Sequence, residues 1–172
     1  VSVASLADRY YQDEGVYRGV YELRGAPRDF IAQANVGGRV MMKGNTKHRF
    51  TSSAENGFAR LADLDAVSLY PSAQLRLMEE VGGILMGKPK VWSKEIDLSK
   101  VDGYFVKIKI HKIGKKMTLP VLRILEDGKA NWTSDLEGRE AVVDRITHED
   151  LIRFHEAECE VLSGYYFDEG RS

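Results

Sequence analysis

The amino-acid sequence predicts an α+β fold, in which helices and antiparallel strands occupy different stretches of the chain. Residues 104–111 alternate between apolar and polar types, which is typical of a strand with one buried face. Residues 72–80 place apolar side chains at helical spacing instead. Glycine-containing breaks at 82–83, 114 and 127–128 divide the chain into short elements.

The first 88 residues are expected to form short elements around a polar connector, residues 43–56. Ser5 is a suitable N-cap for the first helix, and Pro27 opens the second. The expected helices cover residues 6–11, 28–33 and 72–80, and the expected strands cover 19–23, 39–42 and 61–67.

Residues 89–172 are expected to form a second unit, with a weak boundary near residue 88. The strand at 104–111 is predicted to form a hairpin with residues 117–124 across Gly114. The remaining expected elements are strands at 141–143, 160–162 and 165–167 and a helix at 151–158, which the capping-box-like sequence Thr147-His148-Glu149-Asp150 begins.

Composition narrows the classes of protein that fit. With 43% hydrophobic and 30% charged residues, the 172-residue chain can bury a core. The single cysteine, Cys159, excludes an intramolecular disulfide and cysteine zinc sites. A net charge of −1 argues against a uniformly basic nucleic-acid binder. The sequence has neither a signal-peptide pattern nor an apolar run of about 18 residues, so we expect an intracellular protein without a membrane partner, its compartment unknown.

The stretch DAVSLYPS, residues 65–72, places a carboxylate at the end of an expected strand and just before a helix. Nucleotidyl transfer to a 3′-hydroxyl needs two divalent cations, which carboxylates hold on a rigid scaffold. Asp65 would supply one ligand, and the Ser68 hydroxyl with the N–H groups of the helix start would suit a triphosphate. The Tyr70 ring would admit deoxyribose and collide with a 2′-hydroxyl. Alternatively, Leu69 and Tyr70 are core residues and Asp65 caps the helix.

These residues resemble motif A of the family B DNA polymerases, whose pattern is Asp-x-x-Ser-Leu-Tyr-Pro-Ser. Residues 35–39, Asn-Val-Gly-Gly-Arg, resemble the Tyr-x-Gly-Gly segment that precedes motif A in the protein-primed branch. Residues 101–108 and 147–167 resemble the palm insertion of that branch. The resemblance is strongest to polymerases of viruses and self-synthesising mobile elements.

The resemblance implies a DNA-directed DNA polymerase of protein-primed replication, with residues 1–88 as the start of the palm and 89–172 as the insertion. It implies that Asp65 is catalytic and binds metal, with two Mg²⁺ or Mn²⁺ ions in the complete site. The implied dNTP contacts are Ser68, Leu69 and Tyr70, and the implied DNA contacts are Gly37, Gly38 and Arg39. The implied partners are template-primer DNA, a dNTP, a terminal (primer) protein and the remainder of the polymerase chain.

The sequence also departs from the family pattern. Asn35 replaces the usual tyrosine, so this chain lacks the ring that makes contacts there in the family. The chain contains no Lys-x-x-x-Asn-Ser-x-Tyr-Gly motif, no Asp-Thr-Asp-Ser motif and no proofreading pattern before Asp65. We therefore expect a piece of a polymerase, as an excised fragment or a separate subunit, that is inactive alone.

Lys107, Lys109 and His111 lie on one face of their expected strand, as a basic strip that can follow a phosphate backbone. A solvated edge strand protected by lysines fits this pattern equally well. The resemblance favours contact of Lys107 and Lys109 with DNA or the primer protein. A second basic group, at residues 43–49, is more typical of a solvated loop.

Two other interpretations are open. Asp63-Leu64-Asp65 spells the Asp-x-Asp signature of many glycosyltransferases, which is weak at three residues. On a strand, Asp63 would share a face with Asp65 and could support it. The alternative of another class is a nucleic-acid or protein-binding module that keeps a polymerase-like fold without the chemistry.

Overall fold

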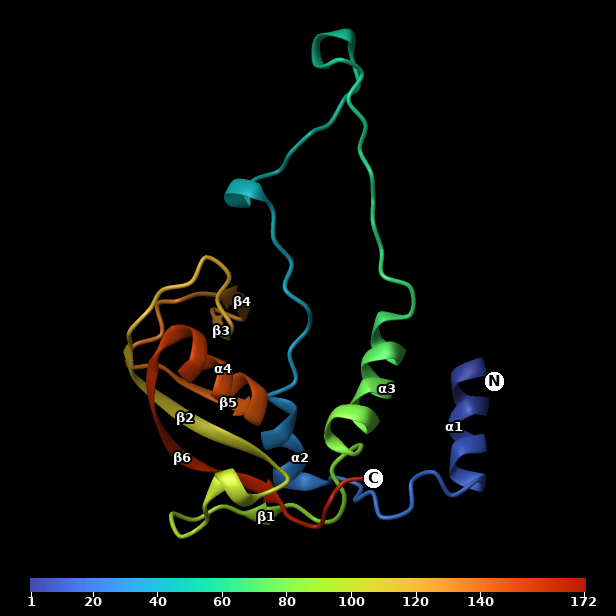
Figure 1. Ribbon diagram of the computed structural model, residues 1–172, viewed down its shortest axis with the longest axis vertical. Helices are drawn as coiled ribbons and strands as arrows, with labels where there is room; N and C mark the ends of the chain where they lie inside the picture. Colours follow the sequence, from blue (N-terminus) through green and yellow to red (C-terminus); the bar gives the residue numbers. More distant parts are fainter.

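The computed structural model describes the backbone of residues 1–172 and every side chain except that of Asn45. The fold is α+β, as the sequence predicts, with four α-helices, a four-stranded antiparallel sheet and a two-stranded hairpin. A compact unit contains the strands and the last helix, α2 lies against it, and α1, α3 and the chain between α2 and α3 extend away from it (Figure 1).

The helices are α1 (Val3–Asp13), α2 (Gly25–Ala32), α3 (Leu69–Val81) and α4 (Arg145–His155). The strands are β1 (Lys90–Val91), β2 (Gly103–Ile113), β3 (Arg123–Glu126), β4 (Lys129–Trp132), β5 (Glu140–Asp144) and β6 (Ala157–Phe167). Short 3-10 turns are η1 (Lys43–Asn45), η2 (Ala54–Asn56) and η3 (Leu98–Lys100).

The main sheet has the strand order β1-β6-β2-β5, and every neighbouring pair is antiparallel. Strand β2 lies in the interior of the sheet, where Lys107 is opposite Val142 of β5 and Ser163 of β6. Register shifts interrupt the β2–β6 pairing at two places. Strand β1 pairs only with Tyr165 and Tyr166 of β6.

The core lies on one face of this sheet. Val106, Ile108 and Ile110 of β2 are fully buried, because alternate residues of a strand point to the same face. They pack in one cluster with Leu151 of α4 and Leu136. Each such side chain contributes about 1.5–3 kcal/mol by leaving water. The predicted alternation of β2 and its buried face are therefore confirmed.

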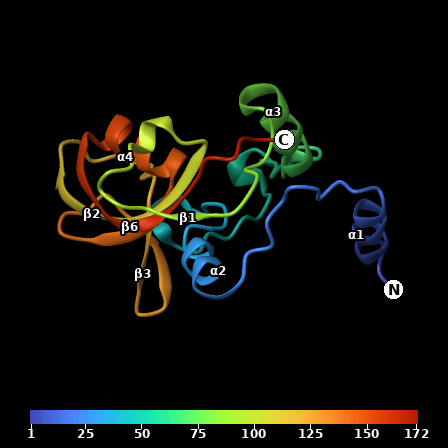
Figure 2. The ribbon, with the colours of Figure 1, turned by 90° about the horizontal axis from the view of Figure 1, so that it is seen from below.

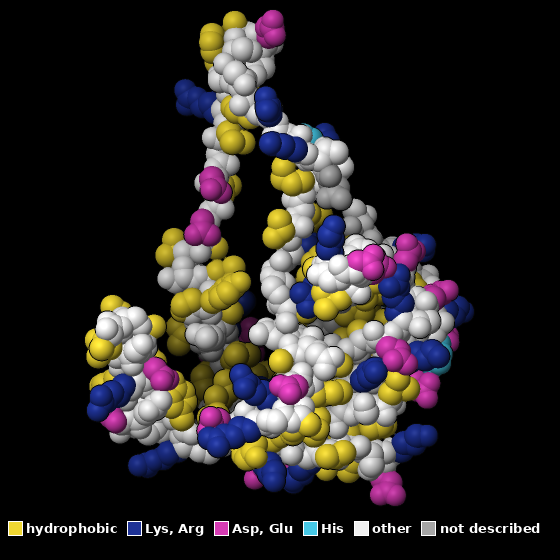
Figure 3. Space-filling model, turned by 180° about the vertical axis from the view of Figure 1, so that it is seen from behind, with side chains coloured by type: hydrophobic (Ala, Val, Ile, Leu, Met, Phe, Trp, Pro, Cys, Tyr) yellow, Lys and Arg dark blue, Asp and Glu magenta, His cyan; other side chains and the backbone are white. Residues whose placement is uncertain are grey.

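On the opposite face, α2 packs across one end of the sheet. The Phe30 ring meets the Tyr165 ring edge-on, with 5.4 Å between centroids. No residue of α2 is fully buried, and the same holds for α1 and α3. Figure 2 shows both helices standing clear of the sheet, and Figure 3 shows apolar side chains uncovered on them.

Three expected strands of the first 88 residues are wrong. Residues 39–42 and 61–67 form no strand, and residues 19–23 contribute only a single bridge, from Val20 to Gly87. Strand residues need neighbouring backbone to satisfy their N–H and C=O groups. The described chain provides no such neighbour for residues 61–67.

The expected hairpin between 104–111 and 117–124 is also wrong. Strand β3 pairs with β4, and both neighbours of β2 come from later in the chain. Asp127 and Gly128 have φ angles of 49° and 74°, so the β3–β4 turn has positive φ at both central residues. Such two-residue turns match the twist of the strands that they join. The turn predicted at these two residues is confirmed.

The helix starts differ from those expected. Ser2, not Ser5, caps α1, and its hydroxyl accepts the Ser5 N–H at 3.1 Å. Helix α4 begins earlier than Thr147, because the Asp144 carboxylate accepts the Thr147 N–H at 2.8 Å. A carboxylate that bonds the N3 position satisfies an otherwise unpaired donor, which favours the earlier start.

Candidate functional site

Asp65 lies in irregular chain shortly before α3, so its expected position at a strand end is wrong. It is exposed, and among the described side chains it makes no hydrogen bond or ion pair. Asp63 is also exposed in the same irregular stretch. The Asp65 carboxylate is therefore fully available to a ligand.

Ser68 is the N-cap residue of α3, with left-handed backbone angles of φ 51° and ψ 42°. Its hydroxyl forms no cap bond, while its carbonyl accepts the Ser72 N–H at 2.9 Å. The first N–H groups of this 13-residue helix are therefore open, and the helix dipole favours an anion there.

Leu69 and Tyr70 form the first turn of α3 and are 54% and 75% exposed. The interpretation of these two side chains as core residues is therefore wrong. The interpretation of Asp65 as the helix cap is wrong as well, because Ser68 occupies that position. Ser68 and Tyr70 thus lie at one exposed helix start, and Asp65 precedes it by three residues.

Gly37 and Gly38 lie in extended, exposed chain after α2, and an added Cβ would meet nothing within 4 Å at either position. Packing within the described chain therefore does not require glycine there. Arg39 differs from both glycines: its Nη2 donates to the Pro120 carbonyl, and its guanidinium lies 5.0 Å from the centre of the Trp132 ring. Arg39 thereby connects this stretch to the compact unit.

Lys107 and Lys109 lie on the face of β2 opposite the core, as predicted. The Lys107 ammonium is 3.3 Å from the Glu140 carboxylate, and His111 Nε2 is 2.7 Å from a Glu160 carboxylate oxygen. Lys109 is in register with both glutamates. Carboxylates on the flanking strands therefore offset much of the positive charge of the strip.

The structure does not bring all the predicted residues together. The motif around Asp65 lies at the start of α3, whereas Lys107 and Lys109 lie in the sheet of the compact unit (Figure 1). Gly37 and Gly38 lie on a third stretch of chain, which follows α2. The candidate site therefore consists of separate groups on this chain.

Among the residues that the structure describes, no group of three His, Cys, Asp or Glu side chains could hold a metal ion. Asp65 is one carboxylate, so the described residues do not by themselves fit a pair of divalent cations. No described helix has the length and apolar character needed to cross a membrane.

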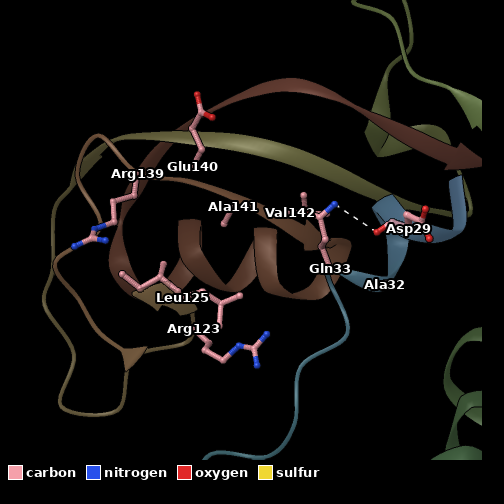
Figure 4. Close-up of a pocket in the computed structure, with 10 residues that line it drawn as sticks. Asp29, Ala32, Gln33, Arg123, Leu125, Arg139, Glu140, Ala141 and Val142 are labelled. Atoms are coloured by element: carbon pink, nitrogen blue, oxygen red, sulfur yellow. Dashed lines mark hydrogen bonds between the residues drawn. The ribbon is translucent and has the colours of Figure 1, made fainter. Parts of the chain in front are cut away.

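A hollow that the sequence did not indicate opens between α2, β3 and β5 (Figure 4). Charges of both signs line it, from Asp29, Arg123, Arg139 and Glu140. Arg139 pairs with Glu126 at 2.6 Å, and the Nε of Arg123 is buried without a partner among the described atoms. No local pattern could have revealed this hollow, because its lining comes from three distant segments.

A polar cluster fixes the start of α4. The Tyr104 hydroxyl is hydrogen-bonded to His148 Nδ1 at 2.8 Å, and burial raises the pKa of Tyr104 to about 12, which keeps this hydroxyl protonated. Burial lowers the pKa of His148. The Arg145 guanidinium lies 5.2 Å from the Tyr104 ring centre and donates to the carbonyls of Leu98, Val101 and Asp102. Since each group bonds within the protein, this cluster is structural.

Cys159 is half-buried on the core side of β6, and burial raises the pKa of its thiol. A raised thiol pKa reduces the thiolate fraction, which is the reactive form.

No protein-family model, curated protein or solved structure matches this chain.

Proposed function

We propose that this chain is a segment of a family B DNA polymerase of the protein-primed branch and supplies its motif A. The observation that carries the proposal is the stretch DAVSLYPS, which leads into the exposed start of α3. Asp65 and Tyr70 are exposed there and have no role in the core of the described chain, so packing does not explain this combination of residues.

Each residue of the motif has a chemical role in this proposal. Asp65 binds the divalent cations, Mg²⁺ or Mn²⁺, that nucleotidyl transfer needs. The open N–H groups at the start of α3 and the Ser68 hydroxyl suit the triphosphate of a dNTP. Leu69 and the Tyr70 ring form the wall under the sugar, so Tyr70→Val should lower the preference for deoxyribonucleotides over ribonucleotides.

Unburied apolar residues in and just before the motif support a role as a segment. Leu61, Leu64 and Val67 are 77%, 91% and 90% exposed. Isolated extended chain is unstable, but a strand and a buried face would form if neighbouring strands from another part of the polymerase paired with it. The other metal-binding carboxylates would come from that part as well. This chain alone should therefore not extend a primer.

The remaining predicted contacts belong to the same proposal. Gly37 and Gly38 leave room for a nucleic-acid backbone, and the insertion offers Lys107 and Lys109 to DNA or to a terminal protein. Since both lysines face carboxylates, binding of DNA must compete with those contacts. Replacing both lysines with glutamine should lower the salt slope of duplex binding by about two. An unchanged slope would remove them from the interface.

The alternative is a binding module without catalysis. The compact unit favours it, because this unit buries its own core around β2 and α4. The two functions differ in what they require of Asp65. Catalysis depends on this carboxylate, whereas a binding module can lose it without effect.

The test is Asp65→Asn in the complete polymerase, with primed template, Mg²⁺ and deoxynucleotides. The amide keeps the shape of the side chain but removes the charge that holds the cation, so incorporation should fall almost to zero with unfolding unchanged. Asp63→Asn is the matched control, and it should retain most of the activity. Retention of more than about a tenth of the activity by Asp65→Asn would overturn the role of Asp65.

A further inference from the structure

Residues 40–60, here called the strap, form a long excursion between α2 and α3 (Figures 1 and 3). The strap contains four basic residues and one acidic residue, although the whole chain has a net charge of −1. The basic residues are Lys43, Lys47, Arg49 and Arg60. All four are exposed, and none forms an ion pair with a described side chain. This local positive charge is therefore free to bind an anion.

The tip of the strap is a turn that side-chain hydrogen bonds close. The Asn56 side-chain oxygen accepts the N–H groups of Ser53 and Ala59 at 3.0 and 3.2 Å. Its nitrogen donates to the Thr51 carbonyl at 2.7 Å. One side chain thus closes the turn through three hydrogen bonds, which defines the conformation of a segment that has no buried core.

This turn directs an aromatic ring outward. Phe58 has a left-handed φ of 54°, which bulky residues rarely adopt, and its N–H donates to the Ser53 carbonyl at 2.8 Å. Its side chain is 68% exposed, and that of Phe50 is 47% exposed. The hydrogen bonds of the turn hold this unfavourable backbone conformation, but nothing in the described chain covers the apolar ring that it presents to water, which points to a ligand.

The base of the strap is attached to the compact unit. Arg39 donates to the Pro120 carbonyl and lies over Trp132 of β4. Farther along, His48 Nε2 is 2.6 Å from the Lys43 carbonyl and closes the turn at η1. The cations and the two rings are therefore carried by an extension with an anchored base.

We propose that the strap binds single-stranded nucleic acid. Its free cations contact phosphates, and Phe50 and Phe58 stack on bases. Aromatic rings can stack in this way only on unpaired bases, so a single strand fits better than a duplex. Neither contact requires a particular base, so binding is independent of sequence. The strap binds whether or not Asp65 holds a metal, which makes this inference separate from the polymerase assignment.

The test measures binding of residues 1–172 to labelled single strands of about 12 nucleotides, a length within the usual range for such sites. Oligo-dT and oligo-rU distinguish DNA from RNA, and a duplex of the same length is the comparison. In the strap variant, Lys43, Lys47 and Arg49 become Gln. Three lost contacts should lower the salt slope on single strands by about two. The control replaces the exposed residues Lys88, Lys94 and Lys129 with Gln, and its slope should match that of the parent.

Phe58→Leu and Phe50→Leu test stacking, because leucine is apolar but has no ring. Each should weaken single-strand binding about tenfold and leave duplex binding unchanged. Equal losses in the strap and control variants, or parental affinity in both leucine variants, would overturn the proposal. Strap-dependent binding to phosphatidylserine vesicles without oligonucleotide binding would also overturn it. Asp65→Asn should keep parental affinity, so loss of polymerase activity and loss of strand binding are separable.

Discussion

The compact unit, residues 89–172, and the region before it differ in whether their apolar side chains are buried. All buried hydrophobic side chains in the described chain lie between Tyr104 and Phe167. The earlier region instead exposes apolar residues on α1, on the strap and on α3, where Met78 is 59% exposed. An apolar pattern alone therefore does not make a core. It needs a second surface to face.

The compact unit provides that second surface within its own chain. The buried face of β2 packs against α4, and the segment between β4 and β5 contributes Leu136 to the same cluster. In the earlier region, α2 finds a surface at Tyr165, and Arg39 finds one at Trp132. Under the proposed function, other parts of the polymerase would cover α3 and residues 61–67. The difference between the regions then reflects where each finds its partner.

Core truncation should produce the largest effect and test this comparison directly. Leu151 is fully buried in α4, so Leu151→Ala should cost about 2–5 kcal/mol of unfolding free energy. Leu64 is 91% exposed, so Leu64→Ala should change stability by no more than about 0.5 kcal/mol. Urea unfolding of both variants measures the difference. Similar losses would mean that Leu64 is buried in solution and that the contrast between the regions is wrong.

The same contrast explains which parts of the fold could be predicted. The alternation of β2 is a local signal, and it correctly identified Ile108 as buried and Lys107 as outward-facing. Strand partners depend on residues far along the chain, so the expected hairpin failed. Residues 61–67 resemble a strand in composition, but composition cannot supply the neighbouring backbone that a strand requires.

The candidate site divides in a similar way. Residues 65–72 are contiguous, so the sequence alone identified them and the helix that follows. The partners of Arg39 are Pro120 and Trp132, and no local pattern connects residues so far apart. Strand register decides which glutamates lie beside Lys107 and Lys109, and this register could not be predicted from the sequence.

Two arginines offer the next test, with a smaller expected effect. Arg145 holds the chain around η3 through three carbonyls, so Arg145→Ala should cost about 1.5–3 kcal/mol of unfolding free energy. Arg39 joins the strap to the compact unit, so Arg39→Ala should loosen the strap and leave urea unfolding of the compact unit almost unchanged. The rate of proteolysis within the strap measures how far Arg39→Ala loosens it. Equal losses of stability would show that the two regions unfold as one.

The smallest effect concerns the two histidines that lie in different regions, His148 in the compact unit and His48 in the strap. Burial lowers the pKa of His148 from its ordinary value of 6.5, and Glu149 offsets part of that shift. The folded state therefore binds a proton less readily than the unfolded state. The contribution of neutral His148 to the free energy of unfolding is fully present above about pH 6.5 and is lost as the pH falls through the lowered pKa.

Protonation would also place a proton on both ring nitrogens of His148, so that in the contact with Nδ1 the Tyr104 oxygen could only accept. Arg145, which lies over the Tyr104 ring, adds a further unfavourable positive charge. Urea unfolding between pH 7.5 and 5 should therefore show less loss of stability in His148→Gln than in the parent. His48→Gln should follow the parent curve, because that exposed ring contacts only the strap. If His148→Gln also followed the parent curve, protonation of His148 would not be coupled to folding.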